Sequence, residues 1–248
     1  MPWRTAWVTG ASTGIGRAVA LRLASQGVDV AVSARTAEKL DALAAEQRHI
    51  HAFPLDVRDG AATVQTFAAI TDRMGVPDLV MLNAGIGIFK SASRFDPALF
   101  RNAFETNVIA MGNALAAVIP RMVERGSGHI ALMGSLAGYR GFARAVHYAP
   151  TKAAIRSMAD CLRFDLEPKG IAITIINPGY IETPLTAAND APMPGLMPLE
   201  PAVDRIVSGL ARRRFEIAFP WHMALAVKIG VRVSNNTYFR VTRWFAGG

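Results

Sequence analysis

Several features are scarce or absent in this sequence, and each absence excludes some classes of protein. The chain of 248 residues has a single cysteine, Cys161, so no disulfide can form within it. We expect Cys161 to be a small buried residue on a helix. No uninterrupted apolar run approaches the roughly 18 residues of a membrane-spanning helix, and the first residues lack the apolar core of a signal peptide. These absences predict a soluble, cytoplasmic protein without disulfides.

Acidic residues are scarce at one end of the chain. The net charge is +8, and residues 212–248 contain seven basic residues against Glu216 alone. The basic character therefore belongs to the C-terminal end and not to the whole chain, which argues against a nucleic-acid-binding function. Residues 221–248 also carry many apolar side chains. We expect this extension to pack on the core or on a partner subunit, or to lie on an anionic membrane surface.

Most of the chain alternates between strand-like and helix-like patterns. Continuously apolar runs predict seven strands, at residues 5–10, 28–34, 49–55, 78–83, 128–135, 171–177 and 215–219. Helical patterns lie between them, at about 14–25, 36–47, 59–74 and 96–123. The alternation predicts an α/β fold, with a doubly wound, mostly parallel seven-stranded sheet and helices on both faces. We assign residues 1–220 to this one Rossmann-like domain and residues 221–248 to an extension.

A glycine-rich loop follows the first strand. Gly10, Gly14 and Gly16 occur in "VTGASTGIGRA", between a strand and a helix. Glycine lets the backbone approach a pyrophosphate, which then meets the free N–H groups of the helix N-terminus. The spacing is G-x-x-x-G-x-G and differs from the G-x-G-x-x-G fingerprint, but the strand–turn–helix context supports a nucleotide site.

Tyr148 and Lys152 form a second motif, in "HYAPTK". Four residues apart on a helix, they share one face, and a lysine ammonium beside a phenol favours the phenolate and lowers the phenol pKa. Pro150 lies between them and is unfavourable inside a helix. Because the first four N–H groups of a helix have no intrahelical partner, the helix should begin close to His147, with Pro150 in its first turn.

These motifs together resemble the short-chain dehydrogenase/reductase family. The resemblance rests on "TGASTGIG", "NAG" at 83–85, Asn107, Ser135, "YAPTK" and "NPGYIET", and covers about residues 5–220. It implies a nicotinamide dinucleotide bound at the glycine loop by Gly10, Ser12, Thr13, Gly14, Ile15 and Gly16. It also implies that Asp56, Val57, Asn83, Ala84 and Gly85 contact the adenosine part, and that Pro178, Gly179, Ile181 and Thr183 contact the nicotinamide part.

The second strand ends in "VSAR", which bears on the choice of nucleotide. Ala34 stands where NAD-type family members carry Asp, and Arg35 follows it. A guanidinium can bind the extra phosphate of NADP, whereas a carboxylate repels it. We therefore expect NADP(H) in preference to NAD(H), with Arg17 as a weaker contributor. Thr13 departs from the many NADP-type relatives that carry a basic residue in the glycine loop.

The family pattern implies four catalytic residues and no metal. Tyr148 would exchange a proton with the substrate. Both Tyr148 and Lys152 would also contact the cofactor, and Lys152 would hold the nicotinamide ribose. Ser135 would donate a hydrogen bond to the substrate oxygen, and Asn107 would hold a water that connects Lys152 to solvent. The sequence therefore predicts an NADP(H)-dependent oxidoreductase that interconverts a carbonyl and an alcohol. A catalytically silent NADP(H)-binding regulator on the same fold is the alternative.

The substrate side is less well defined by the sequence. Residues 183–201 read as a substrate lid, whose apolar members Leu185, Met193, Leu196 and Met197 suggest a lipophilic small-molecule substrate. Arg140 and Arg144 could meet an acidic substrate, but we expect them to be solvent-exposed. Family members commonly pair through the helices that correspond to 96–123 and 148–168, so the resemblance implies a homodimer or homotetramer.

Overall fold

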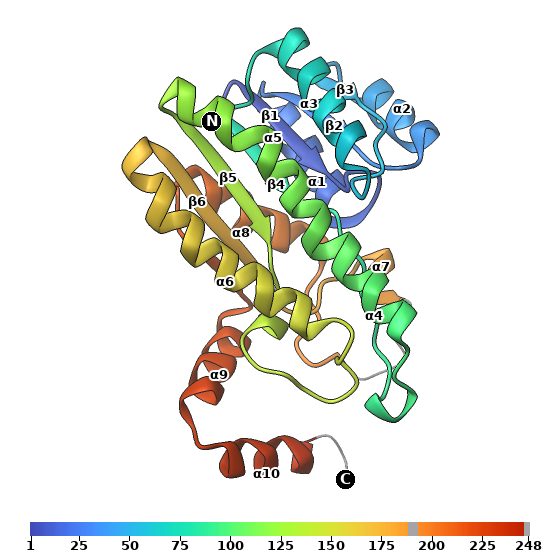
Figure 1. Ribbon diagram of the computed structural model, residues 1–248, viewed down its shortest axis with the longest axis vertical. Coiled ribbons are helices and arrows are strands. Elements are labelled where there is room, and N and C mark those ends of the chain that lie inside the picture. Colours follow the sequence, from blue (N-terminus) through green and yellow to red (C-terminus); the bar gives the residue numbers. More distant parts are fainter. Residues whose placement is uncertain (188–192, 246–248) are drawn as a thin grey trace.

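The computed structural model describes residues 1–187 and 193–245 of the chain. Seven parallel strands form one sheet in the order β3-β2-β1-β4-β5-β6-β7, which confirms the predicted doubly wound α/β fold (Figure 1). The strands are β1 (Thr5–Thr9), β2 (Asp29–Ser33), β3 (Ile50–Ala52), β4 (Leu79–Leu82), β5 (Gly128–Met133), β6 (Ile171–Pro178) and β7 (Glu216–Phe219). The strand order reverses direction at β1 and β4, where such folds bind ligands.

Helices cover both faces of the sheet, so strands β1, β2, β4, β5 and β6 are almost wholly buried, whereas the edge strands β3 and β7 are only partly buried. The helices are α1 (Gly14–Ser25), α2 (Ala37–Glu46), α3 (Gly60–Met74), α4 (Pro97–Phe104), α5 (Ala110–Arg125), α6 (Ala149–Leu166), α7 (Pro184–Ala187), α8 (Leu199–Ala211), α9 (Trp221–Arg232) and α10 (Asn235–Phe245). Apolar residues of α1, α2 and α8 form one core layer, and those of α3, α5 and α6 form the other.

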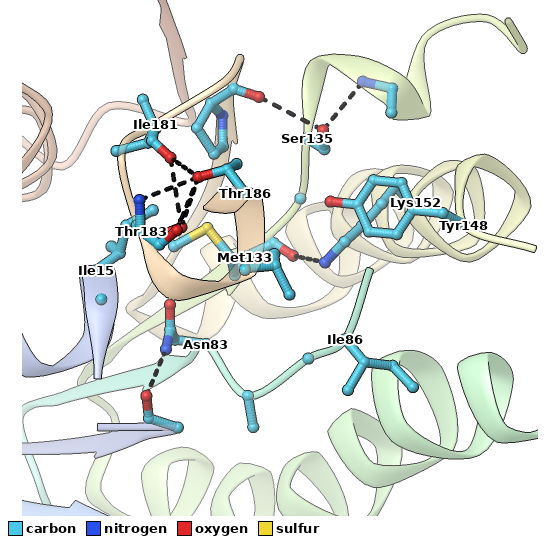
Figure 2. Close-up of a pocket in the computed structure, with 18 of the residues that line it drawn as sticks. Ile15, Asn83, Ile86, Met133, Ser135, Tyr148, Lys152, Ile181, Thr183 and Thr186 are labelled. Atoms are coloured by element: carbon cyan, nitrogen blue, oxygen red, sulfur yellow. Dashed lines mark hydrogen bonds between the residues drawn. The ribbon is translucent and has the colours of Figure 1, made fainter. Parts of the chain in front are cut away.

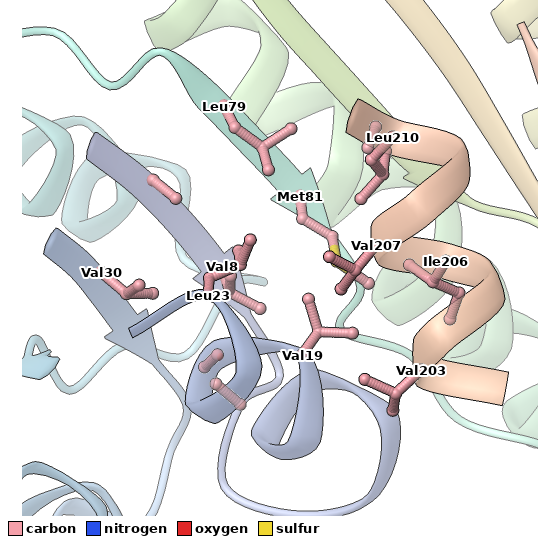
Figure 3. Packing of buried hydrophobic residues seen from close by; sticks show 14 of the residues in the cluster. Val8, Val19, Leu23, Val30, Leu79, Met81, Val203, Ile206, Val207 and Leu210 are labelled. Atoms are coloured by element: carbon pink, nitrogen blue, oxygen red, sulfur yellow. The ribbon is translucent and has the colours of Figure 1, made fainter. Parts of the chain in front are cut away.

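Alternate residues of each strand enter the two core layers. In β1, Val8 packs on the α1 and α8 side, whereas Trp7 packs on the α3 and α5 side. Figure 3 shows the first layer, where side chains of α8 such as Val207 interdigitate with Val19 of α1 and Met81 of β4. This packing holds the carboxyl ends of the strands, and the loops that follow them, in a fixed arrangement.

The helix predicted at about 96–123 is interrupted by a π-helical turn. It runs as α4, a π turn at Glu105–Ile109, and α5. By length and composition alone, Pro97–Arg125 is apolar enough to cross a membrane, with a mean hydropathy of 1.2. A core helix of a soluble domain meets the same criteria, and α5 contributes Met111, Val118 and Met122 to the core.

Two predictions about α6 have different outcomes. The helix begins at Ala149 with Pro150 in its first turn, as predicted, and Tyr148 is its N-cap residue. The prediction that Cys161 is buried is wrong, because Cys161 is exposed. Its neighbour Phe164 is 83% exposed, so both residues lie on the side of α6 that faces away from the core.

Helices α9 and α10 extend beyond the last strand and project from the body of the molecule (Figure 1). Ala224 of α9 is buried, and Lys228 forms an ion pair of 2.6 Å with Glu216 of β7. α10 begins three residues after α9 ends, and the two helices meet at an angle (Figure 1). Residues 246–248 of the predicted extension lie outside the described part of the chain.

Candidate active site

A cavity of about 690 Å³ lies at the carboxyl ends of the strands. Loops after β1, β2, β3, β4, β5 and β6 all contribute to its walls, as expected at the switch point of a doubly wound sheet. It extends from Arg35 and Asp56 to Tyr148 and Lys152. The structure thus brings most of the predicted site residues to one cavity, including Gly10, Ser12, Thr13, Gly14, Ile15, Arg35, Asp56, Val57, Asn83, Ala84, Gly85, Ser135, Tyr148, Lys152, Pro178, Gly179, Ile181 and Thr183.

The glycine loop is packed directly against the end of β4. Gly10 has a φ of +66°, and a Cβ there would lie 2.7 Å from the Cα of Ala84. A Cβ on Gly16, which is buried beneath the loop, would lie 2.5 Å from the carbonyl oxygen of Gly10. The side chain of Asn83 donates hydrogen bonds to the carbonyls of Thr9 and Gly10, at 3.0 and 3.2 Å. The predicted cofactor residue Asn83 therefore braces the loop with its side-chain amide.

One end of the cavity is lined by Arg35, Asp56 and Arg58, and three arginines that follow β1, β2 and β3 differ in their partners. The Arg58 guanidinium donates hydrogen bonds to both oxygens of the Asp56 carboxylate, and this is the largest cause of the lowered pKa of that carboxyl group. Arg17, the predicted weaker contributor, pairs with Glu46. Arg35 is exposed and makes no ion pair within the described residues, so its guanidinium is available to an anion at this end of the cavity. Arg58 also lines the cavity, which the sequence did not indicate.

Tyr148 and Lys152 lie side by side at the start of α6, as Figure 2 shows. The Lys152 ammonium donates a hydrogen bond of 2.8 Å to the carbonyl of Met133 and lies 5.6 Å from the centre of the Tyr148 ring. Burial lowers the pKa of Lys152 to about 8. Burial also raises the pKa of Tyr148 to about 12, although the Ser135 hydroxyl acts against this rise. The net pKa shift of Tyr148 is thus upward, opposite to the sequence prediction, because burial outweighs the hydrogen bond with Ser135.

Ser135 is held by a chain of hydrogen bonds that reaches α9. Its backbone N–H donates to Asn177 Oδ1 at 3.1 Å, and Asn177 Nδ2 donates to Glu216 Oε1 at 2.9 Å. Glu216 in turn accepts from the Lys228 ammonium on α9. The Ser135 hydroxyl remains at the cavity wall, 3.4 Å from the carbonyl oxygen of Pro178. A lysine of the basic extension therefore belongs to the support of this serine.

Asn107 lies in the π turn and is fully buried. Its amide oxygen accepts from the N–H of Ile86 at 2.8 Å, and its amide nitrogen donates to the Ile86 carbonyl and to Thr151 Oγ1, both at 3.0 Å. These bonds join the loop after β4 to α6 behind Lys152. These three bonds make Asn107 a brace between the loop after β4 and α6.

The loop after β6 is ordered by its own hydroxyl groups. Thr186 donates to the carbonyls of Ile181 and Thr183, and its Oγ1 accepts from the Thr183 N–H at 3.0 Å (Figure 2). Of the four apolar residues predicted to line a lid, Leu185 lines the cavity, whereas Met197 pairs with Ile181 beside the core. Residues 188–192 of the predicted lid lie outside the described part of the chain.

The sequence missed one part of the cavity wall. This wall includes Phe89, Tyr180, Met223, Val227 and Tyr238. Tyr180 adjoins the Pro178–Gly179 turn within the motif already quoted, and burial raises its pKa. Nothing local marks the others, because their partners are distant in the sequence.

Arg140 also belongs to this wall, and the expectation that it is solvent-exposed is wrong. Its guanidinium donates to the carbonyl of Val233 at 3.2 Å and to Asn235 Oδ1 at 2.7 Å, so it binds the segment between α9 and α10. Arg144 is exposed, as predicted, and has a φ of +65°.

Comparison with known proteins shows which family this chain resembles in sequence and in fold. The family model described as short chain dehydrogenase matches residues 4–193. An uncharacterized oxidoreductase of Myxococcus xanthus is 38% identical over 247 residues, which cover 98% of each chain. The crystal structure of a short-chain dehydrogenase from Streptomyces avermitilis superposes with a TM-score of 0.85 at 27% identity, covering 97% of each chain. A short-chain dehydrogenase from Sphingobium yanoikuyae in complex with NADPH superposes with a TM-score of 0.82 at 27% identity, covering 92% of this chain and 93% of that one.

Proposed function

This chain belongs to the short-chain dehydrogenase family and is an NAD(P)-dependent oxidoreductase, and we propose that it interconverts a carbonyl compound and an alcohol with NADP(H). The observation that carries the proposal is the convergence of Ser135, Tyr148 and Lys152 on the cavity that also contains the glycine loop. One cavity can therefore hold a dinucleotide and present a proton donor to a small substrate.

The three side chains would share the chemistry at the substrate oxygen. A bound reduced nicotinamide supplies the hydride. Tyr148 stays protonated at neutral pH, because its pKa is raised, and donates its phenolic proton to the carbonyl oxygen. The Lys152 ammonium stabilises the phenolate that remains, and the Ser135 hydroxyl donates a hydrogen bond to the same oxygen. Asn107 keeps Lys152 in place by joining Thr151 to the loop at Ile86.

The preference for NADP(H) rests on Arg35. The cavity is long enough to reach from this arginine to Tyr148, and Ala34 leaves no carboxylate at the end of β2. The free guanidinium of Arg35 is suited to a phosphate on the adenosine ribose. The structure from Sphingobium yanoikuyae contains NADPH and a structural neighbour from Burkholderia phymatum contains NAD, so the proposed choice of NADP(H) rests on Arg35.

The substrate is proposed to be lipophilic. Phe89, Leu185, Met223 and Val227 surround the cavity beyond Ser135 and Tyr148. Such a wall gains free energy by removing apolar substrate surface from water, and it offers few partners to a polar substrate.

NADPH oxidation over a panel of ketones and aldehydes tests the proposal. Tyr148→Phe should lower kcat at least about 100-fold, the lower range for general acid catalysis, and should leave NADPH binding intact. A Tyr148→Phe protein with full turnover contradicts the mechanism. Tight NADPH binding by the wild type without turnover of any compound would favour the silent regulator instead.

The outer faces of α9 and α10 support a second proposal, contact with an anionic membrane surface. Residues 221–248 contain no Asp or Glu, and Arg232 and Arg240 are exposed. Six large apolar residues of these helices are also exposed, namely Trp221, Leu225, Ile229, Val231, Phe239 and Val241. An apolar face flanked by arginines is typical of helices that lie at the surface of anionic bilayers.

Sedimentation with lipid vesicles tests this contact. The protein should sediment with phosphatidylglycerol vesicles at low salt, bind phosphatidylcholine vesicles less, and dissociate as salt screens the arginines. Arg232→Gln with Arg240→Gln should weaken the binding, whereas Arg94→Gln, far from the two helices in the sequence, should not. Failure of the wild type to sediment with anionic vesicles would disprove the proposal.

A further inference from the structure

The loop after Ser135 and the C-terminal helices are joined by a reciprocal contact, which we call the Arg140–Tyr238 latch. The Arg140 guanidinium donates to backbone carbonyls of Gly230 and Val233 near the end of α9, and lies 3.8 Å from the centre of the Tyr238 ring of α10. In return, the Tyr238 hydroxyl donates to the Gly141 carbonyl at 2.7 Å. Both helices are thereby fixed to the loop that begins at the proposed catalytic serine.

Two glycines bring the first turn of α9 close to the cavity. A Cβ on Gly179 would lie 3.2 Å from the sulfur of Met223, and one on Gly195 would lie 2.9 Å from the same atom. A larger side chain at either position would push Met223 away. Because both positions are glycine, Met223 and, one turn later, Val227 form part of the cavity wall.

The cavity wall near α9 and α10 is unfavourable for anionic substrates. Arg140 is its charged group, and its guanidinium is already occupied by two carbonyls, the amide oxygen of Asn235 and the Tyr238 ring. The remaining lining residues here are apolar or aromatic, namely Phe89, Phe142, Leu185, Met223 and Val227. A substrate carboxylate or phosphate would therefore lose its hydration without gaining a free cation.

We infer that α9 and α10 form the chain-binding wall of the substrate site. The carbonyl group lies at Ser135 and Tyr148, and an apolar chain extends from it along Phe89 and Leu185 to Met223, Val227 and Tyr238. The Arg140–Tyr238 latch positions this wall. The inference rests on the proposed function for the reaction, but it makes a separate statement about the substrate class and about the residues that select it.

A homologous series of straight-chain methyl ketones, from butanone to dodecanone, tests the wall. Burial of each added methylene should raise kcat/KM about threefold to fourfold until the chain fills the wall. The same increment should appear in the affinity for straight-chain primary amides, measured by calorimetry with NADPH bound. These amides carry the same carbonyl group and are not reduced, so this measurement does not depend on turnover.

Two matched substitutions on α9 localise the effect. Val227→Trp fills the space beside the wall with a larger side chain. It should lower the ratio of kcat/KM for dodecanone to kcat/KM for butanone at least tenfold. Ile229→Trp adds the same side chain on the exposed side of α9, where Ile229 is 52% exposed, and should keep the wild-type ratio. If Val227→Trp does not fold, Val227→Ala serves as the milder variant. Because it enlarges the site, it should shift the preferred ketone to a longer chain.

The outcomes separate this inference from the proposed function. A Val227→Trp protein that is folded, binds NADPH and keeps the wild-type chain-length dependence would overturn the chain-binding wall. An amide series without any increment in the wild type would also overturn it. A third outcome is that amide affinity rises with each methylene in the wild type but not in Val227→Trp, while no ketone is reduced. That outcome would support the chain-binding wall and contradict the proposed reaction.

Discussion

The two ends of the cavity are built by different means. At the end formed by the glycine loop, main-chain atoms of the loop pack directly on one another and on the end of β4. There is no room for a Cβ on Gly10 or Gly16, and the Asn83 side chain donates hydrogen bonds to main-chain carbonyls. At the substrate end, side chains reach across long sequence separations, as in the bonds of Arg140 to Gly230 and of Tyr238 to Gly141. A wall made of side chains can change its shape by substitution without disturbing the sheet, whereas the glycine loop cannot.

The largest effect is expected at the backbone contact of the cofactor end. Gly16→Ala places a methyl group 2.5 Å from the Gly10 carbonyl oxygen, so backbone must move. We expect the free energy of unfolding to fall by about 1–3 kcal/mol and NADPH binding to be lost. Urea denaturation and fluorescence titration measure the two effects.

Gly112→Ala on α5 is the matched control. A Cβ there meets no atom within 4 Å, and alanine should stabilise the helix by up to about 1 kcal/mol. Equal stability of Gly16→Ala and the wild type would show that the loop is not rigidly packed.

Arg35 should decide between the two nucleotides. Arg35→Ser should raise the Kd of NADPH about 10- to 100-fold and leave the Kd of NADH unchanged, because only NADPH offers a phosphate to the guanidinium. Arg17→Gln, whose arginine is paired with Glu46, should have a smaller effect. An equal loss of affinity for both nucleotides would contradict phosphate recognition by Arg35.

The rate of carbonyl reduction should depend on pH through Lys152. Tyr148, with its pKa of about 12, remains a proton donor throughout, but Lys152 loses its charge as the pH rises through about 8. Without the ammonium the phenolate is not stabilised, so kcat should fall above pH 8, by up to about tenfold per pH unit. A profile of kcat against pH, with the fold followed by circular dichroism, measures this; a constant kcat up to pH 10 would contradict it.

The smallest effect on stability is expected at the latch. Arg140→Gln removes hydrogen bonds of a side chain that is only partly buried, so we expect a loss of only about 1 kcal/mol in the free energy of unfolding. The separation of α9 and α10 from the body should instead appear as faster proteolysis after residue 220. Arg144→Gln, on the same loop but exposed, should change neither quantity. Unchanged proteolysis of Arg140→Gln would mean that other contacts hold these helices.

The fold was largely predictable because its signals are local. Each strand is a short apolar run, and the alternation of strands with helices implies right-handed crossovers and a doubly wound sheet. The start of α6 could also be predicted, since a proline such as Pro150 is best tolerated in the first turn of a helix. The burial of Cys161 was predicted wrongly, because residue type is a weak guide to which face of a helix meets the core.

The site was predictable only in part, for a related reason. Tyr148 and Lys152 are close in the sequence, so their spacing alone places them together. The roles of Lys228, which supports Ser135 through Glu216 and Asn177, and of Arg140 depend on contacts between distant segments. The pKa of Tyr148 likewise depends on burial, which the sequence does not show.

The sequence by itself determined the parallel α/β sheet, the glycine loop and the pairing of Tyr148 with Lys152, because apolar periodicity and short spacings act between neighbours in the chain. Only the tertiary structure decided that the basic extension becomes a wall of the cavity, that Arg140 binds this extension and not solvent, and that burial raises the pKa of Tyr148. The contacts of Arg140 with this extension join segments 90 to 95 residues apart, and the burial of Tyr148 also depends on packing that local patterns in a single sequence do not show.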